Sequence, residues 1–332
     1  MTMRRKLAAV LGAGALLFAA GCSTGSDTSS SDSESKAGGN AGSSATGDIR
    51  IDVITHGAPG DSFWDVVKAG AERAGDDLGV DLHYQSDPDP GKQSTLIDAA
   101  VADGTDGLVV SMANPDGLEA SIKDAVAAGV PVITINSGID RWQEFGAITH
   151  VGQSEKIAGN GAGDRFNELG AKHVICVIQE AGNVALEDRC AGAKETFSGD
   201  MENLQTDNTD LAGSQATIES KLQADDSIDG ILTLGGDMSG AAVAAVAAAG
   251  SSAQVATFDL NADVAQNVVD GKLAFAIDQQ PYVQGYLGVT GIYLKVINGN
   301  DIGGGQPVYS GPAFVTKDNA DTVLKFAEGG TR

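Results

Sequence analysis

Short apolar segments alternate with longer amphipathic ones along most of the chain. Residues 49–55 read IRIDVIT, a run typical of a strand, and over residues 62–78 apolar side chains recur three or four positions apart, as in a helix that buries one face. Further strands are predicted at 80–86, 106–112 and 131–136, and further helices at 91–104 and 115–129. Strands that are apolar along their length are buried on both faces, so this pattern predicts a parallel sheet covered by helices on each side.

The same alternation starts again after residue 150. Helices are predicted at 153–169, 184–197, 214–224, 238–249 and 262–270, with a last one at 281–298. Strands are predicted at 172–178, 203–206 (weakly), 229–235, 254–259 and 272–278, and two short extended segments close the chain. The sequence therefore predicts an α/β protein made of two similar wound units in tandem.

Polar side chains gather where the predicted strands end, which is where open α/β sheets bind their ligands. These positions hold His56, Asp61, Ser111, Asn136 and Ser137 in the first unit, and Gln179, Asn183, Glu187, Asp237, Asp259 and Gln279 in the second. Each residue alone also fits a helix N-cap or a turn. Together, two facing sets of short, mostly neutral hydrogen-bonding groups predict a ligand rich in hydroxyls.

Signatures of catalysis and of cofactor binding are missing from the sequence. The loop HGAPGDSFW lacks the Gly-Lys-Ser/Thr of a phosphate-binding loop, and neither a dinucleotide fingerprint nor a Gly-x-Ser-x-Gly elbow appears. The four histidines are dispersed, without metal-ligand spacing. We expect structural roles for His83 and His173, and either a hinge or a binding role for His150. The expectation is a binding protein with no cofactor and no metal, and not an enzyme.

The N-terminus indicates export and membrane attachment. A basic start at residues 4–6 precedes an apolar run, 7–20, that is too short to span a bilayer and has the length of a signal-peptide core. It ends in FAAGCS, which resembles the lipobox of bacterial lipoproteins and implies cleavage before Cys22 and lipidation of its thiol. An ordinary secretory signal with an incidental cysteine is the alternative. We expect a signal peptide at 1–21 and a lipid anchor on the outer face of the cell membrane.

The segment that follows, residues 22–48, has almost no apolar side chains. Such a segment buries too little surface to offset its ordering entropy, so we expect a disordered tether.

The composition narrows the range of partners. The chain of 332 residues has a formal net charge of −24, with its acidic residues scattered along it, which argues against nucleic acid and anionic headgroups as partners. Besides Cys22, two cysteines remain, Cys176 and Cys190. In an oxidising compartment such a pair indicates a disulfide, and two buried free thiols are the alternative.

Several segments, in their order along the chain, resemble the ribose-type periplasmic sugar-binding proteins, the substrate-binding components of ATP-driven sugar importers. They include IDVITHGAPGDSFWDVVKAG, DGLVVSMANPDGLEASIKDAV, DGILTLGGDMSGAAVAAV, VATFD and GKLAFAIDQQPYVQGYLGV, and the resemblance covers about residues 49–323. It implies the type I periplasmic binding protein fold, in which two Rossmann-like lobes joined by three crossovers close on a ligand like a hinge.

The implied lobes and crossovers are as follows. The N-terminal lobe takes 49–149 and 281–309, and the C-terminal lobe takes 150–280 and 310–328. The crossovers are expected near 149–152, 279–281 and 309–311.

The resemblance also implies ligand contacts in the first lobe. They come from His56, Asp61, Phe63, Trp64, Ser111, Asn136 and Ser137. Asp61 would bind hydroxyls, while Phe63 and Trp64 would cover the apolar faces of a sugar, although aromatic residues at a helix start are often only part of the core. Asn136 and Ser137 replace an Asp-Arg pair that is frequent in the family, which argues against ribose itself.

The second-lobe contacts implied by the resemblance are Asn183, Glu187, Arg189, Asp237, Asp259 and Gln279. Glu187 occupies the place of a ligand-binding arginine, and Arg189 follows two residues later. Asp237 adjoins Gly236, which replaces a ligand-binding asparagine, whereas Asp259 and Gln279 match the family.

The resemblance implies a function in import. The chain would bind a monosaccharide or polyol and deliver it to an ABC permease with its ATPase subunits, as a monomer held to the membrane only by its lipid anchor. The lactose-repressor family shares the fold, but here a signal peptide and tether stand where a DNA-binding helix-turn-helix would be. A lipoprotein that presents a sugar-like signal to a membrane receptor is the alternative function.

Overall fold

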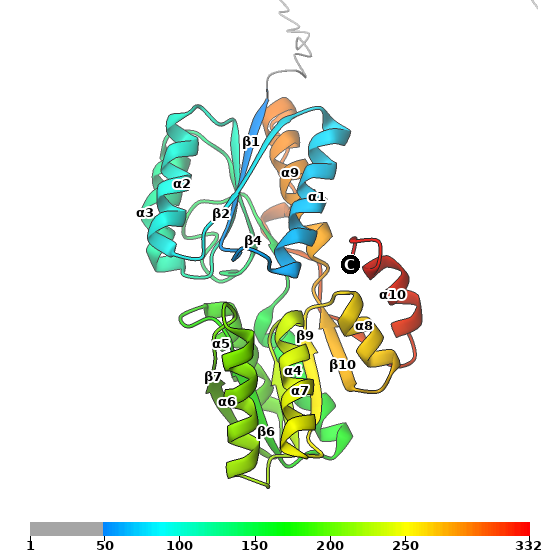
Figure 1. The fold of residues 1–332 in the computed structure, drawn as a ribbon. Coiled ribbons are helices and arrows are strands. Elements are labelled where there is room, and N and C mark those ends of the chain that lie inside the picture. The colour runs from blue at the N-terminus through cyan, green and yellow to red at the C-terminus, as the bar shows by residue number, and fades with distance from the viewer. Residues whose placement is uncertain (1–48) are drawn as a thin grey trace, which may run out of the picture. The chain divides into compact units, whose positions relative to one another are not determined.

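The computed structural model describes residues 49–332, which form two α/β lobes, each built on a six-stranded sheet (Figure 1). The predicted signal peptide, tether and lipidated Cys22 lie outside the described residues. Within residues 49–332, no helix combines the length and the apolarity needed to cross a membrane.

The first lobe has a fully parallel sheet in the order β11-β5-β4-β3-β1-β2. Its strands are β1 (Arg50–Thr55), β2 (Asp81–Ser86), β3 (Gly107–Ser111), β4 (Val132–Asn136), β5 (His150–Gly152) and β11 (Val308–Tyr309). One face is covered by α1 (Ser62–Leu78) and α9 (Pro281–Asn298), the other by α2 (Pro90–Ala102) and α3 (Pro115–Ala127). Neighbouring residues of β1 enter different cores, since Val53 packs under α1 and α9, and Ile54 under α2 and α3.

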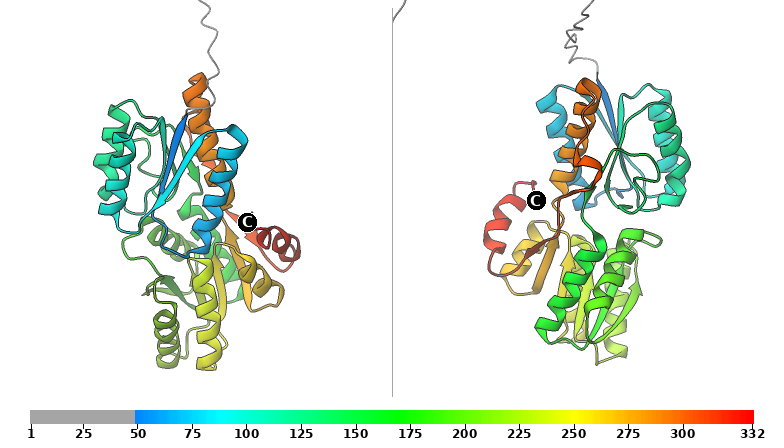
Figure 2. Two further views of the ribbon diagram at one scale, coloured as in Figure 1. Left: turned by 45° about the horizontal axis from the view of Figure 1, so that its top comes forward. Right: turned by 180° about the vertical axis from the view of Figure 1, so that it is seen from behind.

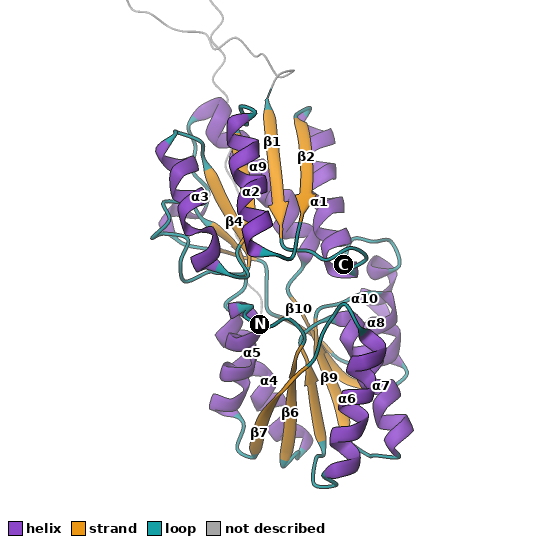
Figure 3. Cartoon of the chain, turned by 60° about the vertical axis from the view of Figure 1, so that its left-hand side comes forward, coloured by secondary structure: helices purple, strands orange, loops and turns teal. Residues whose placement is uncertain are grey.

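The second lobe repeats this plan in the order β12-β10-β9-β8-β6-β7, with only β12 antiparallel. Its strands are β6 (His173–Ile178), β7 (Asp200–Gln205), β8 (Gly230–Thr233), β9 (Gln254–Phe258), β10 (Leu273–Asp278) and β12 (Ala313–Val315). Helices α4 (Glu155–Leu169) and α5 (Val184–Thr196) cover one face, and α6 (Leu211–Ala224), α7 (Gly236–Ala249), α8 (Ala262–Val269) and α10 (Ala320–Ala327) cover the other. Figure 3 shows the strands of each sheet lying between helices.

The chain passes between the lobes three times (Figure 2). The connecting segments are 153–154 after β5, 279–280 after β10 and 310–312 after β11. Residues 150–152 pair with β4 and therefore belong to the first sheet, not to the second lobe, in which the sequence analysis had placed them. The first connection therefore lies at 153–154, just after the expected 149–152.

Helices α1 and α9 pack with their backbones in contact. A Cβ added at Gly70 of α1 would overlap the carbonyl oxygen of Tyr282, and one at Gly285 of α9 would overlap that of Val67. Only glycine permits this approach. This close packing holds α9 tightly against the first lobe. The chain enters α9 directly from the second lobe.

A disulfide joins Cys176 of β6 to Cys190 of α5, with an S–S distance of 1.99 Å. Both cysteines are buried in the core between the second sheet and α4 and α5. The disulfide expected from the sequence is thus present, and the alternative of two free thiols is not.

Candidate ligand-binding site

A cavity of about 460 Å³ lies where the carboxyl ends of the two sheets face each other. Its first-lobe wall comes from the loop after β1, the start of α1 and the residues after β4. Its second-lobe wall comes from the residues after β6 and β9, from α5, from the loop before α6 and from the start of α7. This size and position between two lobes suit a small-molecule ligand.

His56, the first residue after β1, is held by Ser111 at the end of β3. The Ser111 hydroxyl oxygen accepts a hydrogen bond from the His56 backbone N–H at 3.0 Å and lies 2.7 Å from His56 Nδ1. Burial and the positive charge of Arg189 lower the pKa of His56 to about 3, so the ring is neutral. The Ser111 hydroxyl can donate to Nδ1, an arrangement that places the ring proton on Nε2.

Ser111 itself is fully buried and does not line the cavity. A ligand contact was expected for Ser111, but its hydroxyl lies against His56 instead. It is a positioning residue, because its contact orients the ring that does line the cavity.

The start of α1 supplies a carboxylate and two aromatic rings. Asp61 caps the helix, with Oδ1 accepting from the Phe63 backbone N–H at 3.0 Å. Burial, followed by the nearby charges of Glu180 and Asp237, raises the pKa of Asp61 to about 7. Phe63 and Trp64 belong to the first-lobe core and also line the cavity, where a ligand could contact them.

Arg189 lies on the second-lobe wall and is only 2% exposed. Its Nε and Nη2 donate to the two carboxylate oxygens of Glu155, at 2.6 and 3.1 Å, and its Nη1 donates to the Leu234 carbonyl at 2.9 Å. Asp259 Oδ2 lies 3.6 Å from Nη1. Arg189 is therefore held by Glu155 of α4 and by Leu234, the residue after β8, with donor capacity left for the cavity.

Asp259 follows β9 with a φ of 65°, in the left-handed region. Its Oδ1 accepts from Gln279 Nε2 at 2.7 Å, and Gln279 Oε1 in turn accepts from Asn136 Nδ2 at 3.1 Å. Ser137 donates to Asn136 Oδ1 at 2.7 Å. Burial raises the pKa of Asp259 to about 6, although Arg189 opposes this. These four residues form a hydrogen-bonded row that joins the lobes beside the hinge segment 279–280.

A second contact between the lobes lies at the start of α7. Asp237 Oδ1 accepts from the Ser62 hydroxyl at 2.8 Å and from Asn261 Nδ2 at 3.0 Å. Asp237 lines the cavity as expected, but its carboxylate is engaged by a residue of the opposite lobe. Its contacts stabilise the approach of the two lobes.

Glu180, which the sequence analysis did not single out, also lines the cavity. Its carboxylate oxygens accept from Asn183 Nδ2 at 2.8 Å and from Asn208 Nδ2 at 3.0 Å, and burial raises its pKa. Next to it, Gln179 is 7% exposed and its Oε1 has no partner among the described residues. Both directly follow β6, so the strand-end rule could have found Glu180.

Glu187 was expected to bind the ligand, but the structure places it outside the cavity. Its side chain is exposed and it does not line the cavity. The reason is helical periodicity, since Ala185, Leu186 and Arg189 occupy the inward face of α5 and Glu187 the outward one. The other residues expected in the site, Ser111 and Glu187 apart, all line the cavity.

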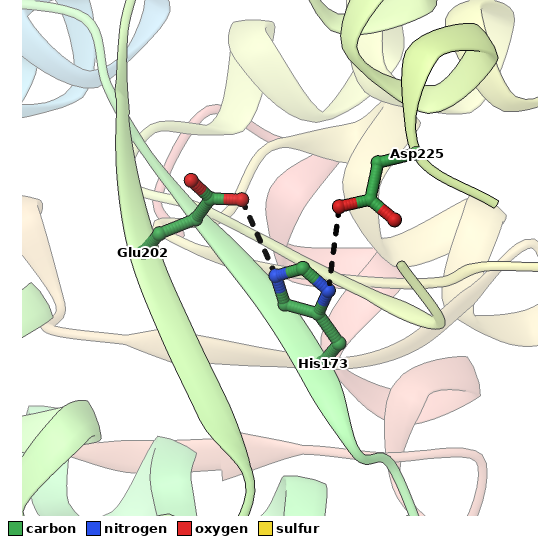
Figure 4. A group of neighbouring side chains, drawn as sticks. All are labelled: His173, Glu202 and Asp225. Atoms are coloured by element: carbon green, nitrogen blue, oxygen red, sulfur yellow. Dashed lines mark hydrogen bonds and ion pairs between the residues drawn. The ribbon is translucent and has the colours of Figure 1, made fainter. Parts of the chain in front are cut away.

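A separate cluster lies on β6, β7 and the end of α6, outside the lining of the cavity (Figure 4). His173 Nε2 is 3.2 Å from a Glu202 oxygen, and Nδ1 is 3.8 Å from an Asp225 oxygen. The two carboxylates thus meet opposite nitrogens of the ring instead of converging with one nitrogen on a shared point. Lys221 also binds Glu202, at 2.8 Å. This geometry is that of an ion-pair cluster, and a structural role for His173 fits it better than metal ligation.

The fold and the cavity define a class: a two-lobed α/β protein that encloses a small polar ligand between its lobes. Comparison with known sequences identifies the family, because residues 51–300 match the periplasmic binding protein domain, and the chain belongs to this family. Its members are substrate-binding proteins rather than enzymes, and they act outside the cytoplasm.

Two curated relatives are named for sugars. The ribose import binding protein RbsB of Haemophilus influenzae is 28% identical over 80% of this chain and 91% of that protein. The xylose/arabinose-binding protein XylF of Sulfolobus acidocaldarius is 26% identical over 74% of this chain and 66% of that protein.

Among the solved structures with this fold is one that also has a similar sequence. It is a carbohydrate transporter from Acidothermus cellulolyticus 11B in complex with myo-inositol, with 46% identity and a TM-score of 0.84. The match covers 86% of this chain and 99% of that one.

Proposed function

We propose that this chain is the substrate-binding lipoprotein of an ABC importer and that its cavity binds myo-inositol or a closely similar neutral ring polyol. The observation that carries this proposal is the lining of the cavity. Carboxylates, amides and two aromatic rings line a space of about 460 Å³. Ring hydroxyls can bond to the polar groups while the apolar faces of the ring lie against Phe63 and Trp64.

The similarity to the myo-inositol complex supports a cyclitol as the first ligand to test. The row of Asn136, Gln279 and Asp259 supports the same ligand class, because it offers neutral donors and acceptors beside a carboxylate. Relatives named as import binding proteins favour delivery to a permease over presentation to a receptor.

Titration calorimetry with myo-inositol, ribose, xylose, arabinose and glucose tests the ligand class. We expect one-site binding of myo-inositol, weaker or absent binding of the pentoses, and no turnover of the bound ligand. Absence of binding to every neutral polyol in the panel would reject the proposal.

A matched pair of variants tests the site assignment. Glu180→Gln removes a charge from the cavity wall, whereas Glu187→Gln makes the same change on the outward face of α5. Losing a charge-assisted acceptor should weaken binding about tenfold in the first variant. The second should bind like the native protein, and the reverse result would show that the site is misassigned.

The proposed anchor rests on the lipobox-like FAAGCS and on Cys22. When expressed in a bacterium that processes lipoproteins, the chain should incorporate a labelled fatty acid and sediment with the membranes. Cys22→Ala should abolish both, since two or more acyl chains on this residue would provide the attachment. Label retained by the variant would contradict lipidation at Cys22.

A further inference from the structure

Negative charge predominates on the cavity wall. Four carboxylates line it: Asp61, Glu180, Asp237 and Asp259. Among the described lining residues the only cationic side chain is Arg189, and Glu155 already binds it through two hydrogen bonds. The neutral ring of His56 adds no compensating charge. The cavity therefore carries a net negative charge that the described residues do not neutralise.

Some acceptor oxygens of the lining residues lack a hydrogen-bond donor among the described residues. Gln179 Oε1 is buried without a partner, and Asp61 Oδ2 has no hydrogen-bond donor among the described residues. Asp259 Oδ2 has only the Arg189 contact at 3.6 Å. A buried oxygen without a donor is costly, so the Gln179 position calls for a donor. The carboxylate oxygens of Asp61 and Asp259 that accept no hydrogen bond can take donors from the ligand.

A hydroxyl and an ammonium group differ in the hydrogen-bond donors and the charge that they bring to these acceptors. A hydroxyl brings one donor together with two acceptor lone pairs, whereas an ammonium brings three donors and no acceptor. An ammonium also supplies the positive charge that the wall lacks. The pKa values of Asp61 and Glu180 are both raised, Asp61 partly by Glu180, so the two carboxylates share one region that a cation would stabilise.

We propose that the cavity accepts ring polyols carrying an amino group, that it binds the protonated amine in preference to the corresponding hydroxyl, and that it rejects anionic derivatives. The amine would lie near Asp61, Glu180 and the unpaired oxygen of Gln179. This inference rests on the proposed function, since it specifies which ring polyols the same cavity takes.

Calorimetry with three probes on one ring tests the inference: myo-inositol, aminodeoxy-myo-inositol and myo-inositol monophosphate, all at neutral pH and low salt. We expect the amine to bind about tenfold more tightly than myo-inositol, equivalent to about 1.4 kcal/mol. The phosphate should bind at least about a hundredfold more weakly, because each close carboxylate repels it.

Asp61→Asn with its control Asp65→Asn locates the effect. Asp65 carries the same charge one turn further along α1, is exposed and does not line the cavity. Asp61→Asn should reduce the preference for the amine to about twofold or less, while Asp65→Asn should retain it in full. Thermal melting checks that each variant folds, and Glu180→Gln provides a second test if Asp61→Asn does not fold.

The outcomes separate this inference from the proposed function. Binding of myo-inositol with equal or weaker binding of the amine overturns the inference alone. A preference that survives both Asp61→Asn and Glu180→Gln also overturns it, because the carboxylates would then not be its cause. Failure of both myo-inositol and the amine to bind overturns the proposed function as well.

Discussion

Asp259→Asn should weaken ligand binding while making the protein more stable. The substitution keeps the shape of the side chain and removes its charge. Asp259 has a φ of 65°, a left-handed conformation that asparagine adopts more readily than most residues, so the variant adds no backbone strain. Alanine would add that strain and confuse the result. The amide oxygen can still accept from Gln279, as Oδ1 does at 2.7 Å.

The loss of affinity follows from the hydrogen bonding at Asp259. The amide presents its NH₂ where Oδ2 now lies, 3.6 Å from Arg189 Nη1, and the ligand loses one charged acceptor. A hydrogen bond to a charged group contributes about 1.5–3 kcal/mol. We therefore expect binding to weaken by about 10- to 150-fold.

The gain in stability follows from burial. Desolvation raises the pKa of Asp259 from 3.8 to about 6, even with Arg189 nearby. The ionised carboxylate thus lowers the free energy of unfolding at neutral pH by about 3 kcal/mol, and the neutral asparagine should recover up to that amount. Between about pH 4 and 6 the folded protein holds this proton more tightly than the unfolded chain. The free energy of unfolding of the native protein therefore falls as pH rises through this range. In Asp259→Asn, which has no proton to lose here, this contribution to the pH dependence of stability should be absent.

Calorimetry gives the affinity, and urea denaturation at pH 5 and pH 7.5 gives the stability. Asp52→Asn is the control, because Asp52 is also buried but lies outside the cavity in an ion pair with Arg50 at 2.9 Å. The control should lose stability and keep its affinity. If Asp259→Asn keeps its affinity and loses stability, as the control does, Asp259 is a structural residue and its assignment to the site is wrong.

Three further expectations concern other parts of the molecule. Ser111→Ala should weaken polyol binding about three- to tenfold in calorimetry, because the His56 ring loses the contact that orients it, and an unchanged affinity would argue against this role. Replacing both cysteines of the disulfide, which are 14 residues apart, should lower the free energy of unfolding by about 3 kcal/mol. A reductant should cause the same loss in the native protein, and a free energy of unfolding that does not change with reductant would contradict the expectation. Gly70→Ala should lower the thermal midpoint through a clash of about 1–3 kcal/mol, whereas Gly240→Ala, where an added Cβ meets nothing within 4 Å, should raise it slightly.

The sequence was sufficient to predict elements with strong local signals. The helix at 62–78 is found with these bounds, because Asp61 caps its start and Gly79, with a φ of 67°, ends it. The helix at 281–298 likewise ends at a left-handed glycine, Gly299.

Elements that depend on tertiary contacts were predicted less well. Strand β7 covers residues 200–205, not 203–206, because its half-exposed edge position alternates in burial and lacks a continuous apolar run. Helix α10 was missed: its eight residues give a short pattern, and Val323 joins a core built mostly by α6, α7 and α8.

The candidate site shows the same division. The strand-end rule located most lining residues, since a parallel sheet brings its carboxyl ends together. It could not decide which side of a helix faces the ligand, and so Glu187 was included. Asn208 comes from the loop after the edge strand β7, and only the folded structure brings it to Glu180.

The central claim is that the cavity between the lobes holds one neutral or amino-substituted ring polyol. Native mass spectrometry of the full chain, purified without denaturation and then exposed to myo-inositol, tests it most directly. We expect a one-to-one complex with myo-inositol that Asp259→Asn forms much more weakly and Asp52→Asn forms normally. A protein that takes up neither myo-inositol nor any other polyol of the panel, or one that binds it equally well after Asp259→Asn, would contradict the claim.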